Sequence, residues 1–182
     1  MEKLVRQFIE LSRLTGGELK RETVDLSAVA RDVVESLRAR HPGDDITCKI
    51  APGLAANGDP SLVRLALTHL IGTAWSATAG RPGAHIEFAS ARVGDRETFV
   101  ITDSGGTIDR PYTGALPGAV QRLDNGHGQD GTAVTLVMVQ RIIQRHGGRV
   151  WVEAIPEGGA VFFTLGQEPA KSSTSVSIPL AR

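Results

Sequence analysis

The stretch DPSLVRLALTHLIGTAWSAT, residues 59–78, decides the fold. Asp59 suits the N-cap of a helix, and Pro60 suits the first helical position. On such a helix His69 and Thr73 lie one turn apart on the same face. The spacing of one helix face, three or four residues per turn, is followed by Leu62, Leu65 or Ala66, Leu70, Thr73 and Ala77. The stretch therefore predicts a helix that carries both core residues and polar side chains.

Composition predicts one domain with short extensions. Hydrophobic residues make up 41% of the 182 residues, enough for one core. Lys plus Arg equal Asp plus Glu at 20 each, and no basic run is interleaved with aromatic residues, so we expect no nucleic-acid partner. No apolar run approaches the roughly 18 residues of a membrane helix, and a single cysteine, Cys48, fits a reducing compartment. We therefore expect a cytoplasmic protein without direct membrane insertion.

The segments before residue 59 predict a helix, a strand, a second helix and a second strand. Residues 1–14 have helical spacing, and Gly16 and Gly17 end that helix. Because a lone helix of this length is marginal in water, its apolar side must pack either on this domain or on a second copy, through Leu4, Phe8 and Leu11. After it we expect an edge strand at 18–25 and a helix that Ser27 caps and that ends at Arg40. A strand at 46–50 and a connection at 52–59 follow.

The segments after residue 78 predict two hairpins separated by a loop and a helix. Residues 85–93 and 98–103 form the first hairpin, and residues 149–155 and 160–165 form the second. Residues 104–131 contain seven glycines and two prolines and predict a long loop. In the helix at 132–146 the spacing predicts a core face of Val134, Val137, Met138, Arg141 and Ile142.

The pattern predicts an α+β fold, a two-layer sandwich with helices on one face of a mixed sheet. The expected division is an N-terminal helix at 1–17, the domain at 18–166 and a polar tail at 167–182. Within that tail, Val176, Ile178 and Leu180 stand at every second position, so a short strand there is an alternative.

The helix at 59–78 resembles the N-box helix of the ATP-binding catalytic domain of bacterial sensor histidine kinases, the GHKL or Bergerat fold. Further stretches of the same family occur in the same order along residues 24–165. They are the D-x-G box at Asp103–Gly105, the Gln-Arg-Leu phrase at 121–123, the last glycine box from Gly131 to Leu136, and the run RHGGRVW at 145–151.

The resemblance implies ATP and Mg²⁺ as cofactors and assigns roles to individual residues. Asp103 and Gly105 stand where the family contacts adenine, and Gly131 and Leu136 belong to the box that holds the phosphates. His69 and Thr73 stand at the two asparagine positions of the N-box, so Thr73 would be the Mg²⁺ ligand. In the family members that hydrolyse ATP a carboxylate base stands at the position of His69, which is therefore the candidate base.

Several family residues are replaced at the triphosphate end of the expected site. Ser76 replaces a lysine, and Ala133 and Thr135 replace glycines that let the backbone approach phosphate. The second glycine of the D-x-G-x-G box is Thr107. Two residues have alternative interpretations: His69 as a polar side chain lining an emptied pocket, and Asp103 as a strand-end aspartate that caps the following turn.

These substitutions leave alternative hypotheses for function. The first is a degenerate ATP-binding domain without kinase activity that binds proteins in two-component signalling: a second copy, a receiver domain or a sensor module. The second is an active domain that passes the ATP γ-phosphate to a histidine outside this chain. A phosphotransfer protein would need an exposed histidine on a helical hairpin, and the sequence shows none. The first hypothesis is favoured. The chain is expected either to be part of a larger sensor protein or to be a separate protein.

Overall fold

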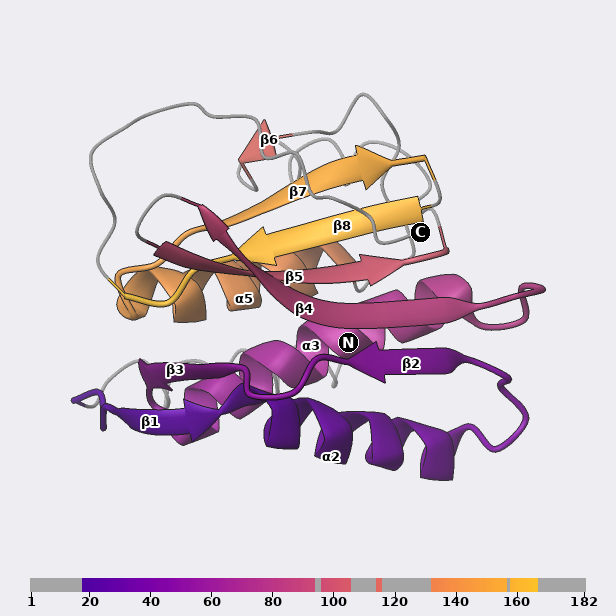
Figure 1. Ribbon diagram of the computed structural model, residues 1–182, viewed down its shortest axis with the longest axis horizontal. Helices are drawn as coiled ribbons and strands as arrows, with labels where there is room; N and C mark the ends of the chain where they lie inside the picture. Colours follow the sequence, from indigo (N-terminus) through magenta and orange to yellow (C-terminus); the bar gives the residue numbers. More distant parts are fainter. Residues whose placement is uncertain (1–17, 94–95, 106–113, 116–131, 157, 167–182) are drawn as a thin grey trace.

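The computed structural model describes residues 18–93, 96–105, 114–115, 132–156 and 158–166 (Figure 1). Its helices and strands are, in chain order, β1 (Glu22–Asp25), α2 (Leu26–Arg40), β2 (Thr47–Ile50), β3 (Ala55–Gly58), α3 (Pro60–Thr78), β4 (His85–Val93), β5 (Arg96–Asp103), β6 (Gly114–Ala115), α5 (Thr132–Arg145), β7 (Val150–Ile155) and β8 (Gly158–Phe163). The helix expected at 1–14, the tail and nearly all of the long loop lie outside these residues.

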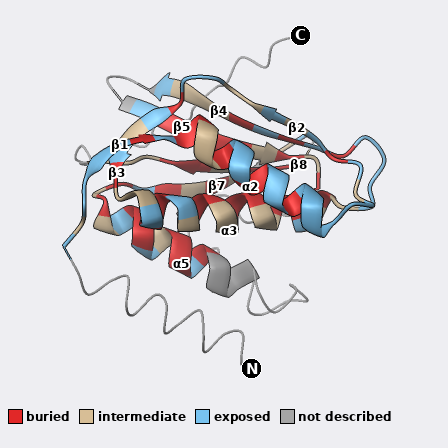
Figure 2. Cartoon of the chain, turned by 90° about the horizontal axis from the view of Figure 1, so that it is seen from below, coloured by how far each residue is buried: buried red, intermediate tan, exposed pale blue. Residues whose placement is uncertain are grey.

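The main sheet has six strands in the order β2-β4-β5-β8-β7-β6. Strands β2 and β4 are parallel, whereas β4, β5, β8, β7 and β6 pair antiparallel with their neighbours. Helices α2, α3 and α5 lie together on one side of this sheet (Figure 2). Strands β1 and β3 form a separate antiparallel pair beside the helices. The predicted α+β sandwich, with helices on one face of a mixed sheet, is confirmed.

Helix α3 is the central element of the helical layer. The Asp59 carboxylate caps it, because one carboxylate oxygen accepts from the backbone N–H groups of Ser61 and Leu62 at 3.0 and 3.2 Å. Burial of α3 extends beyond the one face that the spacing predicted, because the helix packs against α2, α5 and the sheet. The predicted face omitted the buried residues Val63, Leu67, Ile71 and Trp75.

Two details of the sequence-based prediction are wrong: the N-cap of α2 and the connection before α3. The N-cap of α2 is Asp25, whose carboxylate accepts from the Ala28 N–H at 2.8 Å. Ser27 lies inside the helix, where its hydroxyl donates to the Ala51 carbonyl and accepts from the Leu54 N–H. The expected connection at 52–59 contains strand β3, because pairing with β1 overrides the low strand propensity of its sequence AANG.

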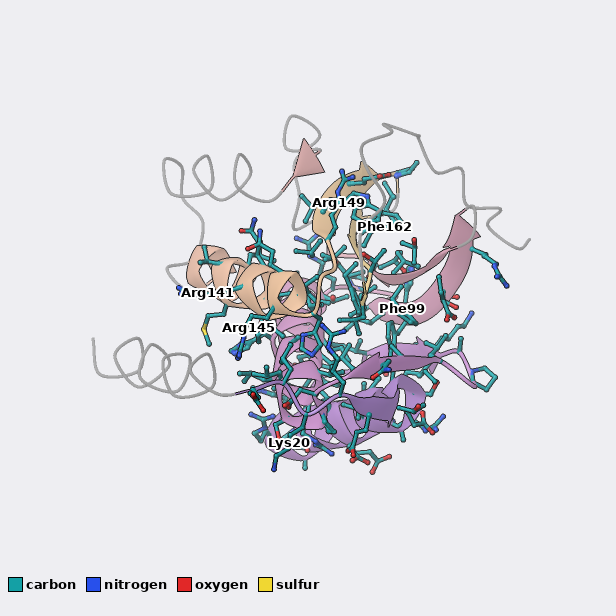
Figure 3. All side chains as sticks on the ribbon, turned by 90° about the vertical axis from the view of Figure 1, so that its left-hand side faces the viewer. Lys20, Phe99, Arg141, Arg145, Arg149 and Phe162 are labelled. Carbon is teal, nitrogen blue, oxygen red and sulfur yellow. The ribbon has the colours of Figure 1, made fainter. Side chains whose placement is uncertain are left out.

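On α5 the predicted core face is partly wrong. Met138 and Ile142 are buried, but Val137 is 43% exposed and Arg141 is exposed as well. Figure 3 shows Arg141 and Arg145 along α5. Val139 and Ile143 occupy the core in their place, so the buried face is rotated from the predicted one. The side chain of Val134 lies outside the described part of the chain.

A fully buried histidine joins the end of α5 to the start of α3. His146 has 0% exposure, and its Nδ1 lies 2.7 Å from the Ile142 carbonyl oxygen. Its Nε2 accepts from the backbone N–H of Asp59 at 3.0 Å. A β-carbon on Gly58 would lie 3.1 Å from the imidazole ring, so the chain passes directly over it. The sequence did not predict this link between α5 and α3.

We expect His146→Ala to destabilise the domain by about 3 kcal/mol, because it opens a cavity and leaves the partly buried Asp59 N–H without its acceptor. His146→Gln, whose amide oxygen can accept from the same N–H, should lose clearly less. The measurement is the urea unfolding midpoint of each variant. Equal losses for the two variants would contradict the role given to this hydrogen bond.

Candidate functional site

The predicted site residues of α3 lie on one partly exposed strip of the helix. His69, Thr73 and Ala77 follow one another at four-residue steps and are each of intermediate exposure. Gly72 and Ser76 lie beside them, Gly72 partly exposed and Ser76 exposed. A β-carbon on Gly72 would meet no atom within 4 Å, so this side of the helix has open space next to it.

The hydroxyls on this strip donate to their own helix. Thr73 Oγ1 donates to the His69 carbonyl at 2.9 Å, and Ser76 Oγ donates to the Gly72 carbonyl at 3.0 Å. Both are the i to i−4 bonds that serine and threonine often form within helices. The two positions therefore offer small neutral oxygens, with no amide at position 73 and no cation at position 76.

Asp103 ends strand β5 and organises the turn that follows. Its carboxylate accepts from the Gly105 N–H at 2.8 Å, and the residue is 5% exposed. Its backbone pairs with Ile86 on one side and Gly159 on the other. This is the alternative interpretation made from the sequence, an aspartate that caps the glycine turn. A carboxylate held in this way has a fixed orientation beside α3.

Gly105 brings this turn against α3. A β-carbon at Gly105 would lie 2.5 Å from the Ala77 carbonyl carbon and oxygen, so only glycine fits here. Since Ala77 is one turn beyond Thr73, the strip of α3 and the turn of Asp103 lie next to each other. The contact places the turn of Asp103 and Gly105 beside Ala77, with Thr73 one turn and His69 two turns back along α3.

The remaining predicted residues contribute differently. Leu136 is buried in the main core, where it packs as a structural residue of α5. Gly131 lies outside the described residues. Among the described residues no group of three His, Cys, Asp or Glu side chains could hold a metal ion.

Cys48 adds no reactive group near this site. Burial raises the pKa of its thiol, and the nearby Arg38 charge opposes that rise. The thiol therefore stays protonated at neutral pH, and it packs against the main core from strand β2.

Residues 58–169 match the family model described as histidine kinase-, DNA gyrase B- and HSP90-like ATPase. The chain belongs to this family. The match begins at Gly58, runs through α3 and ends just beyond the last strand, so it contains every predicted site residue. The resemblance seen in the sequence is confirmed.

Several similar proteins are named as sensory or regulatory kinases. The chain is 29% identical over 181 residues to the adaptive-response sensory kinase SasA of Synechococcus elongatus, covering 91% of this chain and 44% of SasA. It is 26% identical over 167 residues to the methanogenesis regulatory histidine kinase FilI of Methanothrix harundinacea, covering 91% of this chain and 19% of FilI. The chain thus spans less than half the length of these relatives.

Solved histidine kinase structures share the fold. The mycobacterial sensor histidine kinase MprB superposes with a TM-score of 0.62 at 22% identity, covering 82% of this chain and 99% of that one. Full-length ShkA in complex with AMPPNP gives a TM-score of 0.65 at 23% identity, covering 91% of this chain and 36% of that one. Within the described residues, no helix is both long and apolar enough to cross a membrane.

The two glycines should respond in opposite ways to alanine. Gly72→Ala should stabilise the domain by up to about 1 kcal/mol, because alanine favours the helix and meets no neighbour. Gly105→Ala should destabilise it by about 1–3 kcal/mol, because its β-carbon would overlap the Ala77 backbone. Thermal unfolding of both variants beside the parent chain checks this. A destabilising Gly72→Ala would show that this position needs its free space for another reason.

Proposed function

We propose that this chain is a degenerate ATP-binding domain of the histidine kinase type, without kinase activity, that acts through protein contacts in two-component signalling. One observation carries the proposal: the hydroxyls of Thr73 and Ser76, at positions where the family has an asparagine and a lysine, donate to their own helix. Thr73 lacks the amide that would bind Mg²⁺, and Ser76 lacks the positive charge that would offset the charge of the triphosphate.

The substitutions at the triphosphate end of the site act together to weaken nucleotide binding. Ala133 and Thr135 also replace phosphate-box glycines in the sequence. If each change weakens binding by about 1–2 kcal/mol, the affinity for Mg²⁺-ATP falls by several orders of magnitude. The preserved Asp103 turn does not oppose this, because its hydrogen bond to Gly105 and the contact with Ala77 keep it in place without nucleotide.

The proposed division is an N-terminal helix at 1–17, the domain at 18–166 and a polar tail at 167–182. The proposed partners are a second copy bound through Leu4, Phe8 and Leu11, or a sensor or receiver domain of a two-component system. The kinase relatives support this pathway, since the similar proteins are named as sensory or regulatory kinases. A cytoplasmic location, alone or within a larger sensor protein, is part of the proposal.

The second candidate is an active catalytic domain that transfers the ATP γ-phosphate to a histidine outside this chain. The retained Asp103–Gly105 turn favours it, because a fixed carboxylate beside α3 can accept a hydrogen bond from the adenine amino group. In that case Thr73 would be the magnesium ligand and His69 the candidate base.

Calorimetric titration with ATP and with ADP, each with and without Mg²⁺, separates the candidates. We expect no heat of binding up to about millimolar nucleotide, which corresponds to about 4 kcal/mol of binding free energy. Micromolar, magnesium-dependent ATP binding that disappears in Asp103→Asn would overturn the degenerate assignment. Equal binding of ATP and ADP without Mg²⁺ would instead indicate a sensor of adenine nucleotides.

Restoring the family residues should restore binding. A chain carrying Thr73→Asn, Ser76→Lys, Ala133→Gly and Thr135→Gly should gain magnesium-dependent ATP affinity of at least about tenfold, because a ligand, a cation and two close backbone approaches return. The same titration measures it. The matched control adds Asp103→Asn to the restored chain and should lose the gain. A restored chain that still binds nothing would place the defect elsewhere than at these four positions.

A further inference from the structure

A small apolar cluster lies between α3 and α5, apart from the main core. Its buried members are Leu62 and Ala66 of α3 and Ile142 of α5, and Leu65 and Leu19 pack against them. Four of these residues belong to the two helices, whereas Leu19 belongs to the chain before β1. We refer to the five residues as the α3–α5 cluster. A segment outside the helical layer therefore takes part in packing within that layer.

Residues 18–21, which we call the strap, carry Leu19 and lie outside every helix and strand. The backbone N–H of Lys20 donates to Asp59 Oδ2 at 3.2 Å, and this bond is exposed. Leu19 is partly exposed, and the other side chains of the strap are exposed. Figure 3 looks at this end of the domain, with Lys20 below Arg145 of α5. The strap is therefore held to the helices by one partly buried side chain and one exposed hydrogen bond.

The other bonds of Asp59 do not depend on the strap. Its second carboxylate oxygen, Oδ1, accepts from the N–H groups of Ser61 and Leu62. Its own N–H donates to His146 Nε2 at 3.0 Å. If the strap moves away, α3 keeps both its cap and its link to α5. Opening of the strap therefore does not require the helical layer to come apart.

The contacts of Leu19 and Lys20 are weak enough for the strap to open in the folded domain. A partly buried leucine and an exposed hydrogen bond favour the closed form over the open form by roughly tenfold to hundredfold. The open form is then about 1–10% of the molecules, a population that a modest force or contact can shift. Strand β1 begins at Glu22, which pairs with Gly58 of β3, so the sheet pairing sets the end of the part that opens.

We propose that residues 18–21 form a conformational switch that opens while the rest of the domain stays folded. In the closed form Leu19 packs on the α3–α5 cluster, and in the open form the cluster becomes accessible. Whatever holds the chain before β1 away from α3 favours the open form. The candidate strip of α3 lies further along the helix, so the switch stands whether or not the domain binds nucleotide.

A cysteine introduced at Ala66 measures the opening through its rate of reaction with a maleimide. Every chain carries Cys48→Ala, so that the native thiol does not contribute. Ala66 is 3% exposed in the α3–α5 cluster, and Ala74, at 4%, is the matched position in the main core. The Ala66→Cys chain should react at least about tenfold faster than the Ala74→Cys chain, because the strap opens more often than the whole domain unfolds.

Two substitutions in the strap should favour the open form. Lys20→Pro removes the N–H that Asp59 accepts and should raise the reaction rate of the Ala66→Cys chain by about fivefold. Its matched control, Lys20→Ala, keeps the N–H and should leave the rate unchanged. Leu19→Ser weakens the packing on the cluster and should raise the rate as well. The Ala74→Cys chain should react at the same rate with and without each change.

Three results would contradict the proposal. Equal rates for the Ala66→Cys and Ala74→Cys chains would mean that the cluster opens only when the whole domain unfolds. A rate of the Ala66→Cys chain that both Lys20→Pro and Leu19→Ser leave unchanged would mean that reagent reaches the cluster without movement of the strap. A faster reaction of the Ala74→Cys chain with either change would mean that the strap belongs to the cooperative fold and does not open by itself.

Discussion

The hydrogen bond from the Asp59 N–H to His146 Nε2 fixes the start of α3, the helix that carries the candidate site strip, to the end of α5. Asp59 begins α3 and His146 follows the last turn of α5, so one bond joins elements 87 residues apart in sequence. The same aspartate caps α3 and accepts from the Lys20 N–H at 3.2 Å, which ties the chain before β1 to this point. Leu19 packs nearby against a small cluster of Leu62, Ala66 and Ile142. The helical layer therefore has a hydrogen-bonded and apolar joint at one end.

This arrangement separates what the fold requires from what nucleotide chemistry requires. Gly105 is fixed by its approach to Ala77, and Gly148 by its approach to the Thr164 carbonyl, where a β-carbon would lie 1.9 Å from the oxygen. Asp103 holds a turn, and Leu136 fills the core. Each of these residues has a packing or hydrogen-bonding reason to stay that is independent of ATP. The fold does not require the family's asparagine at position 73 or its lysine at position 76, because a hydroxyl in either place donates to a carbonyl of its own helix.

The sequence predicted the fold class and most elements, because α3, α5 and the two hairpins have strong periodicity and clear terminal signals. It did not predict β3, whose small polar sequence forms a strand only through its partner β1. It placed the cap of α2 at Ser27 rather than Asp25, since both types cap well and only the geometry decides. The family resemblance predicted that Asp103 and the α3 strip belong to one site. The contact between them, Gly105 against Ala77, was not predicted, because it depends on tertiary packing and not on local sequence.

The pairing of β5 with β8 has a consequence for how such a domain can diverge. Asp103 is held in the sheet between Ile86 and Gly159, and α5 is held by its own packing on α3, so both ends of residues 104–131 have separate anchors. The cost of closing a chain between two such anchors grows slowly with its length, by about 0.6 kcal/mol for each doubling. Apart from Gly105 and strand β6, which the fold itself uses, changes of length between β5 and α5 should therefore place little burden on folding. Selection can change the length of this connection while β5 and α5 stay in place.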